Sequence, residues 1–363
     1  MKIHAKEELP VELVFSPQWW NRQTGLTFDR DFFFHPARRV EDERKMENHL
    51  YEKWGKYGLG RDRNRDRPEV GAVHLASGYL LSEMLGCKIE YREAAPPSVA
   101  CFNADSLDTR PIEQSFESGA FKDFDQMRET LKTQYGYLSG DVNWSGILNL
   151  AIDLRGQDIF LDMVTEKEEC VRFFSALADM IERFTDGLQE GSRSTSVSVN
   201  RNVLNINEPV LLHSECSLTM ISEEMYREYL LPYDIRWSRK KVPFGIHYCG
   251  PDPHRFAASF GEVPNLSFLD VGFGGDVGIL RRHLPHTFLN LRLNPVELAR
   301  CGPEEVRQTI LRLVEQSGDL SQTGLCCINM DDTVPDENVT AIFETREEIL
   351  QTFRASGDPP PCF

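Results

Sequence analysis

The residues of this chain that are best suited to chemistry are His247 and Cys249, two positions apart at the end of the apolar run 242–246. A second source of thiols, Cys326 and Cys327, lies at the end of another short apolar run. One imidazole nitrogen and two thiolate sulfurs are typical donors of catalytic zinc sites, which leave a fourth position open. Zinc held in this way acts as a Lewis acid on the group that enters the open position. The spacing therefore predicts an enzyme that activates a thiol or a water.

Only one of the two adjacent cysteines can face such an ion, because neighbouring residues of a strand point to opposite sides. Cys327 is preferred as the third ligand, and Cys326 is the alternative. Asp270, a catalytic candidate, ends the apolar run 266–269. Three roles are open for it: a fourth ligand, a hydrogen-bond partner of His247, or a polar strand end outside the site.

The elements that would position these residues alternate along the C-terminal half of the chain. Short apolar runs, each followed by an amphipathic helix, are typical of parallel strands joined by crossover helices. Strands are expected at 88–91, 196–204, 242–247, 266–271, 287–293 and 324–328, and helices at 72–85, 124–135, 147–160, 167–190, 225–233, 253–260, 276–283, 303–316 and 337–350. Repetition of this unit favours a single (β/α)8 TIM barrel, an α/β fold whose chemistry lies where the strands end.

Two further catalytic candidates, His213 and Glu215, follow the apolar pair Leu211-Leu212. They are suited to binding a substrate or handling protons. Packing of this loop on the barrel rim is the alternative interpretation. The adjacent Cys216 belongs to no metal-ligand pattern in the sequence, and we assign it a structural role.

The chain of 363 residues is long enough for one barrel domain. We assign residues 71–355 to the barrel, because the regular helix and strand patterns begin there. Residues 1–70 are irregular and partly helical, with a polar loop at 61–68, and are expected to form an N-terminal extension that packs on the barrel. Residues 356–363 are expected to be a disordered tail.

The charge and cysteine content exclude several classes of protein. A formal net charge of −17 argues against binding to nucleic acids and to anionic membranes. The first residues contain no apolar stretch of the kind that a signal peptide has, and no run is long enough to span a membrane. Nine cysteines without a secretion signal indicate free thiols in a reducing compartment. We therefore expect a cytoplasmic protein.

Several motifs resemble those of the uroporphyrinogen decarboxylase superfamily over roughly residues 70–350. Segment 221–233 resembles the helix before its metal strand, and His247-Tyr248-Cys249-Gly250 resembles the zinc motif of its corrinoid-dependent methyltransferase branch. The next strand–helix unit of the superfamily is matched at 294–298 and 302–306, and its last strand and turn at Cys326, Cys327, Thr333, Pro335, Glu337 and Asn338.

The resemblance implies a zinc ion bound by His247, Cys249 and one of Cys326 and Cys327. It further implies a small-molecule thiol acceptor and a methyl donor, methylcobalamin, carried by a separate corrinoid protein, or the reverse transfer. Arg292 stands in place of the family's asparagine, where it would either bind an acidic group of a substrate or cofactor or lie on the barrel rim. The chain is also compatible with a homodimer.

Two other functions remain open at this level. One is a carboxy-lyase that decarboxylates a tetrapyrrole without a metal. The true decarboxylases resemble one another in an arginine-rich N-terminal motif and an acidic residue, whereas residues 20–25 only faintly match the motif and 75–79 contain no carboxylate. The other is a non-catalytic barrel that binds a corrinoid or a porphyrin.

Overall fold

The central element of the protein is a curled sheet of six parallel strands in the order β1-β10-β9-β8-β7-β6. The computed structural model describes residues 3–60, 69–70, 79–100, 105–135, 139–140, 144–189, 205–240 and 243–356. The strands are β1 Val11–Phe15, β6 Leu211–Ser214, β7 Phe244–His247, β8 Leu266–Val271, β9 Phe288–Leu293 and β10 Thr323–Met330. A parallel sheet of the barrel type is thus confirmed for the described residues, and closure by eight strands stays a prediction.

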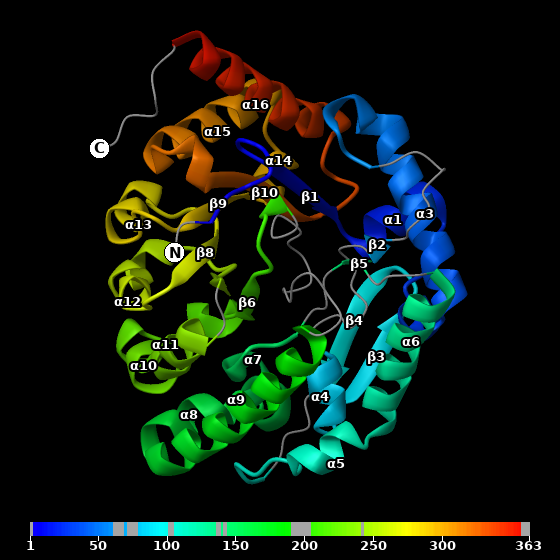
Figure 1. Ribbon diagram of the computed structural model, residues 1–363, viewed down its shortest axis with the longest axis vertical. Helices are drawn as coiled ribbons and strands as arrows, with labels where there is room; N and C mark the ends of the chain where they lie inside the picture. The colour runs from blue at the N-terminus through cyan, green and yellow to red at the C-terminus, as the bar shows by residue number, and fades with distance from the viewer. Residues whose placement is uncertain are drawn as a thin grey trace.

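Helices cover the outer side of this sheet, as Figure 1 shows. They are α10 Glu223–Tyr229, α11 Leu231–Lys240, η4 Pro253–Phe256, α12 Ala257–Gly261, α13 Val277–His283, α14 Pro295–Leu298, α15 Pro303–Ser317 and α16 Asp336–Ser356, with η3 Cys216–Met220 and η5 Leu320–Gln322 as short 3-10 turns. The expected alternation of strands and helices is therefore confirmed from residue 211 onward. The expected helix 225–233 is divided into α10 and α11.

The helix ends follow from local side chains. Ser222 and Asp276 cap α10 and α13, because their side chains accept hydrogen bonds from the backbone N–H groups of Met225 and Ile279. Gly318 ends α15 in the left-handed conformation, at φ 71°. These three residues therefore fix the ends of their helices through contacts within a few residues.

Replacing Asp276 with Ala is expected to lower the free energy of unfolding by about 1 kcal/mol, because the N–H of Ile279 loses its acceptor. Urea denaturation measures the change. Glu315→Ala, at an exposed position inside α15, is the control and should change stability by less than about 0.5 kcal/mol. Equal stability of the two variants would contradict the capping role.

The N-terminal half adds one strand to the sheet and a helical layer beside it. Strand β1 lies in the segment 1–70 that the sequence assigns to an extension, and it pairs with β10. The other elements are α1 Pro17–Thr24, α2 Arg30–Phe34, α3 Pro36–Trp54, η1 Gly55–Tyr57, β2 Glu69–Val70, α4 Leu80–Met84, β3 Lys88–Arg92, β4 Ala95–Ala100, α5 Ile112–Phe116, α6 Gly119–Tyr135, β5 Ser139–Gly140, α7 Ile147–Arg155, α8 Asp158–Thr165 and α9 Lys167–Gln189. The expected strand 88–91 is β3, which pairs with β4 outside the barrel sheet.

Some predictions cannot be compared with the fold. The strand at 196–204, the loop at 61–68, the first half of the helix at 72–85 and the tail from 357 onward lie outside the described residues. The second half of the helix expected at 72–85 is found as α4. The expected helix 147–160 is interrupted, because Gly156 takes φ 72° and ends α7 before α8 begins.

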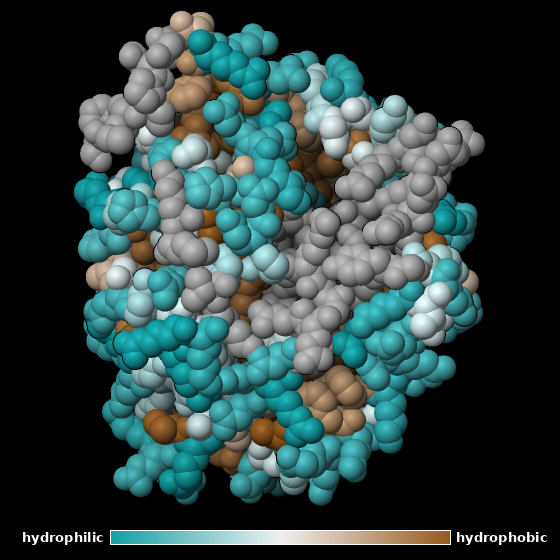
Figure 2. Space-filling view, viewed as in Figure 1, coloured by the Kyte–Doolittle hydropathy of each residue, from teal (hydrophilic) through white to brown (hydrophobic). Residues whose placement is uncertain are grey.

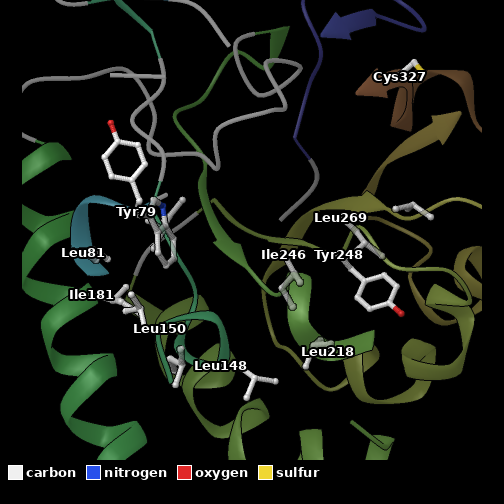
Figure 3. Packing of buried hydrophobic residues seen from close by; sticks show 14 of the residues in the cluster. Tyr79, Leu81, Leu148, Leu150, Ile181, Leu218, Ile246, Tyr248, Leu269 and Cys327 are labelled. Atoms are coloured by element: carbon white, nitrogen blue, oxygen red, sulfur yellow. The ribbon is translucent and has the colours of Figure 1, made fainter. Parts of the chain in front are cut away.

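The two faces of the sheet bury different groups. An inner cluster packs within the curl of the sheet and consists of Ile3, Ile206, Val210, Leu212, Phe268 and Phe288. A larger outer core fills the space between the sheet and the helices, and Figure 3 shows part of it, including Ile246, Leu269 and Cys327. The exposed face in Figure 2 is mainly hydrophilic, with small separate hydrophobic areas. None of the helices within the described residues is long and apolar enough to cross a membrane.

Candidate metal centre

The strand register collects polar side chains at the carboxyl ends of β7 to β10. His247 pairs with Asp270, Asp270 pairs with Asn290, and Arg292 pairs with Cys326 on the adjacent strand. Side chains at paired positions of a sheet lie on the same face. All five are buried, and their contacts join them into one polar layer on the inner face.

Three metal-binding side chains converge at the edge of this layer. One ligand atom from each of Cys216, His247 and Cys249 lies within 4.8 Å of the others. We call these three residues the thiol centre. Two of them are ligands that the sequence predicts, whereas Cys216 was assigned a structural role. The signal that sequence reasoning missed is the position of Cys216 relative to its strand. Ser214 of β6 pairs with His247 of β7, so Cys216 and Cys249 occupy the same position, two residues after the paired residues.

The two adjacent cysteines of β10 face opposite sides, as expected for neighbours in a strand. Cys326 faces inward, and its Sγ lies 3.7 Å from Oδ1 of Asp270. Cys327 pairs with Leu293 and packs in the outer core (Figure 3). The preference for Cys327 as a ligand is therefore corrected, because its side chain points away from the thiol centre. Cys326 lies next to the centre but outside the three-residue group.

Asp270 holds the imidazole of His247. Its Oδ2 contacts Nδ1 of His247 and also accepts a hydrogen bond of 2.6 Å from Nη2 of Arg292. Nδ2 of Asn290 donates to Oδ1 of Asp270 over 3.2 Å. Of the three roles that the sequence left open, the geometry is that of a partner of His247. An aspartate at Nδ1 orients the ring and leaves Nε2 for a ligand.

Arg292 lies inside the polar layer, so its alternative placement on the barrel rim is wrong. The residue is only 8% exposed. Burial acts to lower the pKa of its guanidinium, but Asp270 and the surrounding thiols outweigh burial and raise that pKa. Its Nε has no hydrogen-bond partner among the described residues. The guanidinium of Arg292 therefore places a permanent positive charge beside the thiol centre.

Within the thiol centre, the surroundings of Cys249 favour its thiolate form. The hydrogen bond from the Cys216 thiol, assisted by His247 and opposed by burial, lowers the pKa of Cys249 to about 4. The same hydrogen bond and burial raise the pKa of Cys216 well above its ordinary value. Burial acts to lower the pKa of His247, yet Asp270 and Cys249 raise it overall. A thiolate beside an imidazole is a donor set suited to a soft or borderline metal ion.

His213 and Glu215 belong to a separate group on the outer face of β6. Nδ1 of His213 lies 2.7 Å from Oδ1 of Asp234 in α11 and 3.1 Å from Oε1 of Glu215. All three side chains are fully buried between the sheet and the helices. The structure thus places these two catalytic candidates away from the inner polar layer, and their catalytic role stays a prediction.

Comparison with known proteins supports the fold. No family model matches the sequence, and no curated protein matches it either. Among solved structures, the chain is similar to a methyltransferase from Methanosarcina mazei, with a TM-score of 0.66 and 13% identity over 95% of each chain. It is also similar to a B12-independent methionine synthase from Shewanella sp. W3-18-1 in complex with selenomethionine. That match has a TM-score of 0.50 and 11% identity, and covers 96% of this chain and 100% of the other.

These similarities define the class of fold. At such identities they show that the chain is an α/β protein with the barrel-type fold of the two enzymes. A barrel-type fold is what the resemblance to the uroporphyrinogen decarboxylase superfamily implies, and the two structures confirm this expectation for the fold alone.

Proposed function

We propose that this protein is a zinc-dependent methyltransferase whose metal is bound at the thiol centre. The observation that carries the proposal is the convergence of Cys216, His247 and Cys249 at the carboxyl ends of the strands. Enzymes with a barrel of this kind have their active sites at that end. The two structural neighbours, a methyltransferase and a methionine synthase, support methyl transfer as the proposed reaction class.

The donor set of the thiol centre fits zinc. Two sulfurs and one imidazole nitrogen are provided by residues from two adjacent strand ends, and Cys326 offers a further sulfur nearby. Zinc bound here would supply Lewis acidity that keeps a substrate thiol in its nucleophilic, deprotonated form. Three protein ligands leave one position for that thiol.

The surrounding residues orient the ligands and balance their charge. Asp270 fixes the His247 ring through Nδ1, and Asn290 holds Asp270 in place. Arg292 pairs with the Asp270 carboxylate and lies close enough to the thiols for its charge to affect them. Its positive charge would stabilise the additional negative charge that a substrate thiolate brings into a buried site.

Within this proposal, the methyl donor is a corrinoid on a partner protein, and the acceptor is a small thiol. The nucleophilic sulfur would form a bond to the methyl carbon while the cobalt–carbon bond breaks, and the bonding electrons would stay on cobalt. The donor is inferred from the resemblance of the His247-Tyr248-Cys249-Gly250 motif. The reverse transfer uses the same groups.

Zinc analysis of the purified protein tests the proposal together with a methylcobalamin assay. We expect about one zinc per chain. Consumption of methylcobalamin in the presence of a thiol should be lost after chelation and restored by zinc. Cys249→Ser and His247→Ala should each lower the rate by about 100-fold or more, because each removes a ligand.

Cys301→Ser is the matched control for this experiment, since Cys301 is a free, half-buried cysteine outside the thiol centre. It should retain zinc and activity. A folded wild-type protein that binds no zinc would overturn the proposal. Zinc binding without methyl transfer from methylcobalamin would preserve the metal site and reject the corrinoid donor.

A further inference from the structure

A second group of metal-binding residues lies outside the thiol centre. His213 at the end of β6, Glu215 in the following loop and Asp234 in α11 each have one ligand atom within 4.8 Å of the others. Each residue has an exposed fraction of 0%. We call these three residues the carboxylate cluster. It is separated from the thiol centre by β6, because Ser214 faces Cys216 while His213 faces α11.

The carboxylate cluster has more acceptors than donors. Asp234 is satisfied, since Oδ1 lies 2.7 Å from Nδ1 of His213 and Oδ2 accepts a hydrogen bond of 2.6 Å from the Tyr226 hydroxyl. Glu215 is not satisfied. Its Oε1 lies 3.1 Å from the same Nδ1, yet neither carboxylate oxygen has a hydrogen-bond partner among the described residues. One ring N–H cannot serve two carboxylates.

The electrostatic surroundings of Glu215 also disfavour a negative charge on its carboxyl group. Burial raises the pKa of Glu215 well above its ordinary value, and Asp234, the only charged group found to act on it within the described residues, raises that pKa further. The rings of Trp144 and Trp237 enclose His213, with centroids at 5.4 Å and 4.7 Å. Two carboxylates in such apolar surroundings are costly unless a positive charge compensates them.

The spacing of the ligand atoms fits a bound ion. Two ligands at right angles around a cation, each at about 2.1 Å, are about 3.0 Å apart. The observed separations from Nδ1 of His213, 2.7 Å to Asp234 and 3.1 Å to Glu215, bracket this value. One nitrogen and two carboxylate oxygens are ligands suited to manganese or ferrous iron, whereas the sulfur ligands of the thiol centre are less suited to these ions.

We propose that His213, Glu215 and Asp234 bind a divalent cation that is separate from the metal of the thiol centre. The cation replaces the proton on Nδ1 of His213 and gives Glu215 the partner that it lacks. It also joins the end of β6 to α11. Because Glu215 directly precedes Cys216, the cation fixes the loop that carries one ligand of the thiol centre.

Titration of the zinc-loaded, full-length protein with Mn²⁺ tests this site, with electron paramagnetic resonance reporting the free ion. One Mn²⁺ should bind per chain. Glu215→Gln should weaken binding by about tenfold or more, because a neutral amide replaces a carboxylate ligand. Glu228→Gln, an exposed position in α10, is the matched control and should bind Mn²⁺ as the wild type does.

Two further measurements separate the proposal from its alternatives. Cys249→Ser should still bind Mn²⁺, which would show that the site is independent of the thiol centre. Mn²⁺ should raise the unfolding temperature of the wild-type protein, a test that stands even if Glu215→Gln fails to fold. If the wild type binds no Mn²⁺ and its unfolding temperature is unchanged, Glu215 keeps a proton instead and the proposal is overturned.

Discussion

Replacement of Arg292 with Met is expected to lower the free energy of unfolding by about 3–5 kcal/mol. Arg292 donates a hydrogen bond of 2.6 Å to Asp270, and both residues are buried. Methionine keeps the unbranched apolar part of the side chain but lacks the guanidinium, so the variant retains part of the packing and leaves the Asp270 carboxylate without its permanent cation. Urea denaturation of the metal-free protein measures the loss.

This loss should depend on pH. The pKa of His247 is already raised, and the Arg292 charge opposes that rise, so the variant should raise it further. A histidine with a raised pKa stabilises the fold fully below its unfolded pKa and loses that contribution as pH increases through the folded pKa. Arg292→Met should therefore lower the free energy of unfolding most at alkaline pH, where His247 is neutral and cannot replace the positive charge of Arg292.

A double variant is the control for this interpretation. Arg292→Met with Asp270→Asn removes both charges and should recover part of the stability, as the pair is then replaced by neutral groups. If the double variant is no more stable than Arg292→Met, the effect comes from packing and the electrostatic explanation is wrong.

Replacement of Cys216 with Ala is expected to raise the pKa of Cys249 in the metal-free protein. The wild-type Cys249 should titrate near its pKa of about 4, because the Cys216 thiol donates a hydrogen bond to the thiolate and His247 assists. Alanine cannot donate that bond. Ultraviolet absorbance of the thiolate, recorded against pH, should show the transition move toward the ordinary thiol value of 9.0.

The depressed pKa of Cys249 also predicts a stability profile. An acidic group with a lowered pKa contributes stability that is fully present above the unfolded pKa of 9.0 and is lost as pH falls through about 4. Cys216→Ala should flatten this part of the profile. Cys301→Ala is the control, since Cys301 lies outside the thiol centre and burial raises the pKa of its thiol. An unchanged Cys249 transition in Cys216→Ala would show that His247 alone sustains the thiolate.

Much of the architecture is readable from local patterns. The strand 266–271 is found where the sequence predicts it, and the helix caps at Ser222, Asp276 and Gly318 are formed by residue types that favour caps. These features depend on neighbours within a few residues, since strand apolarity and helix caps are short-range effects. The same reasoning does not show that Gly156 interrupts a helix, because the apolar spacing of 147–154 continues beyond the glycine at Ile159 and Phe160.

The sequence by itself determined that an imidazole and thiols lie beside two apolar runs, because His247 and Cys249 end one run and the Cys326-Cys327 pair belongs to another. The tertiary structure alone decided which thiols meet. Sheet register places Cys216 beside Cys249, although the two residues belong to different strand ends. It also directs Cys327 into the outer core, since strand alternation allows only one of two neighbours to face inward. Side chains distant in sequence become neighbours through hydrogen-bonded pairing, which composition and spacing do not specify.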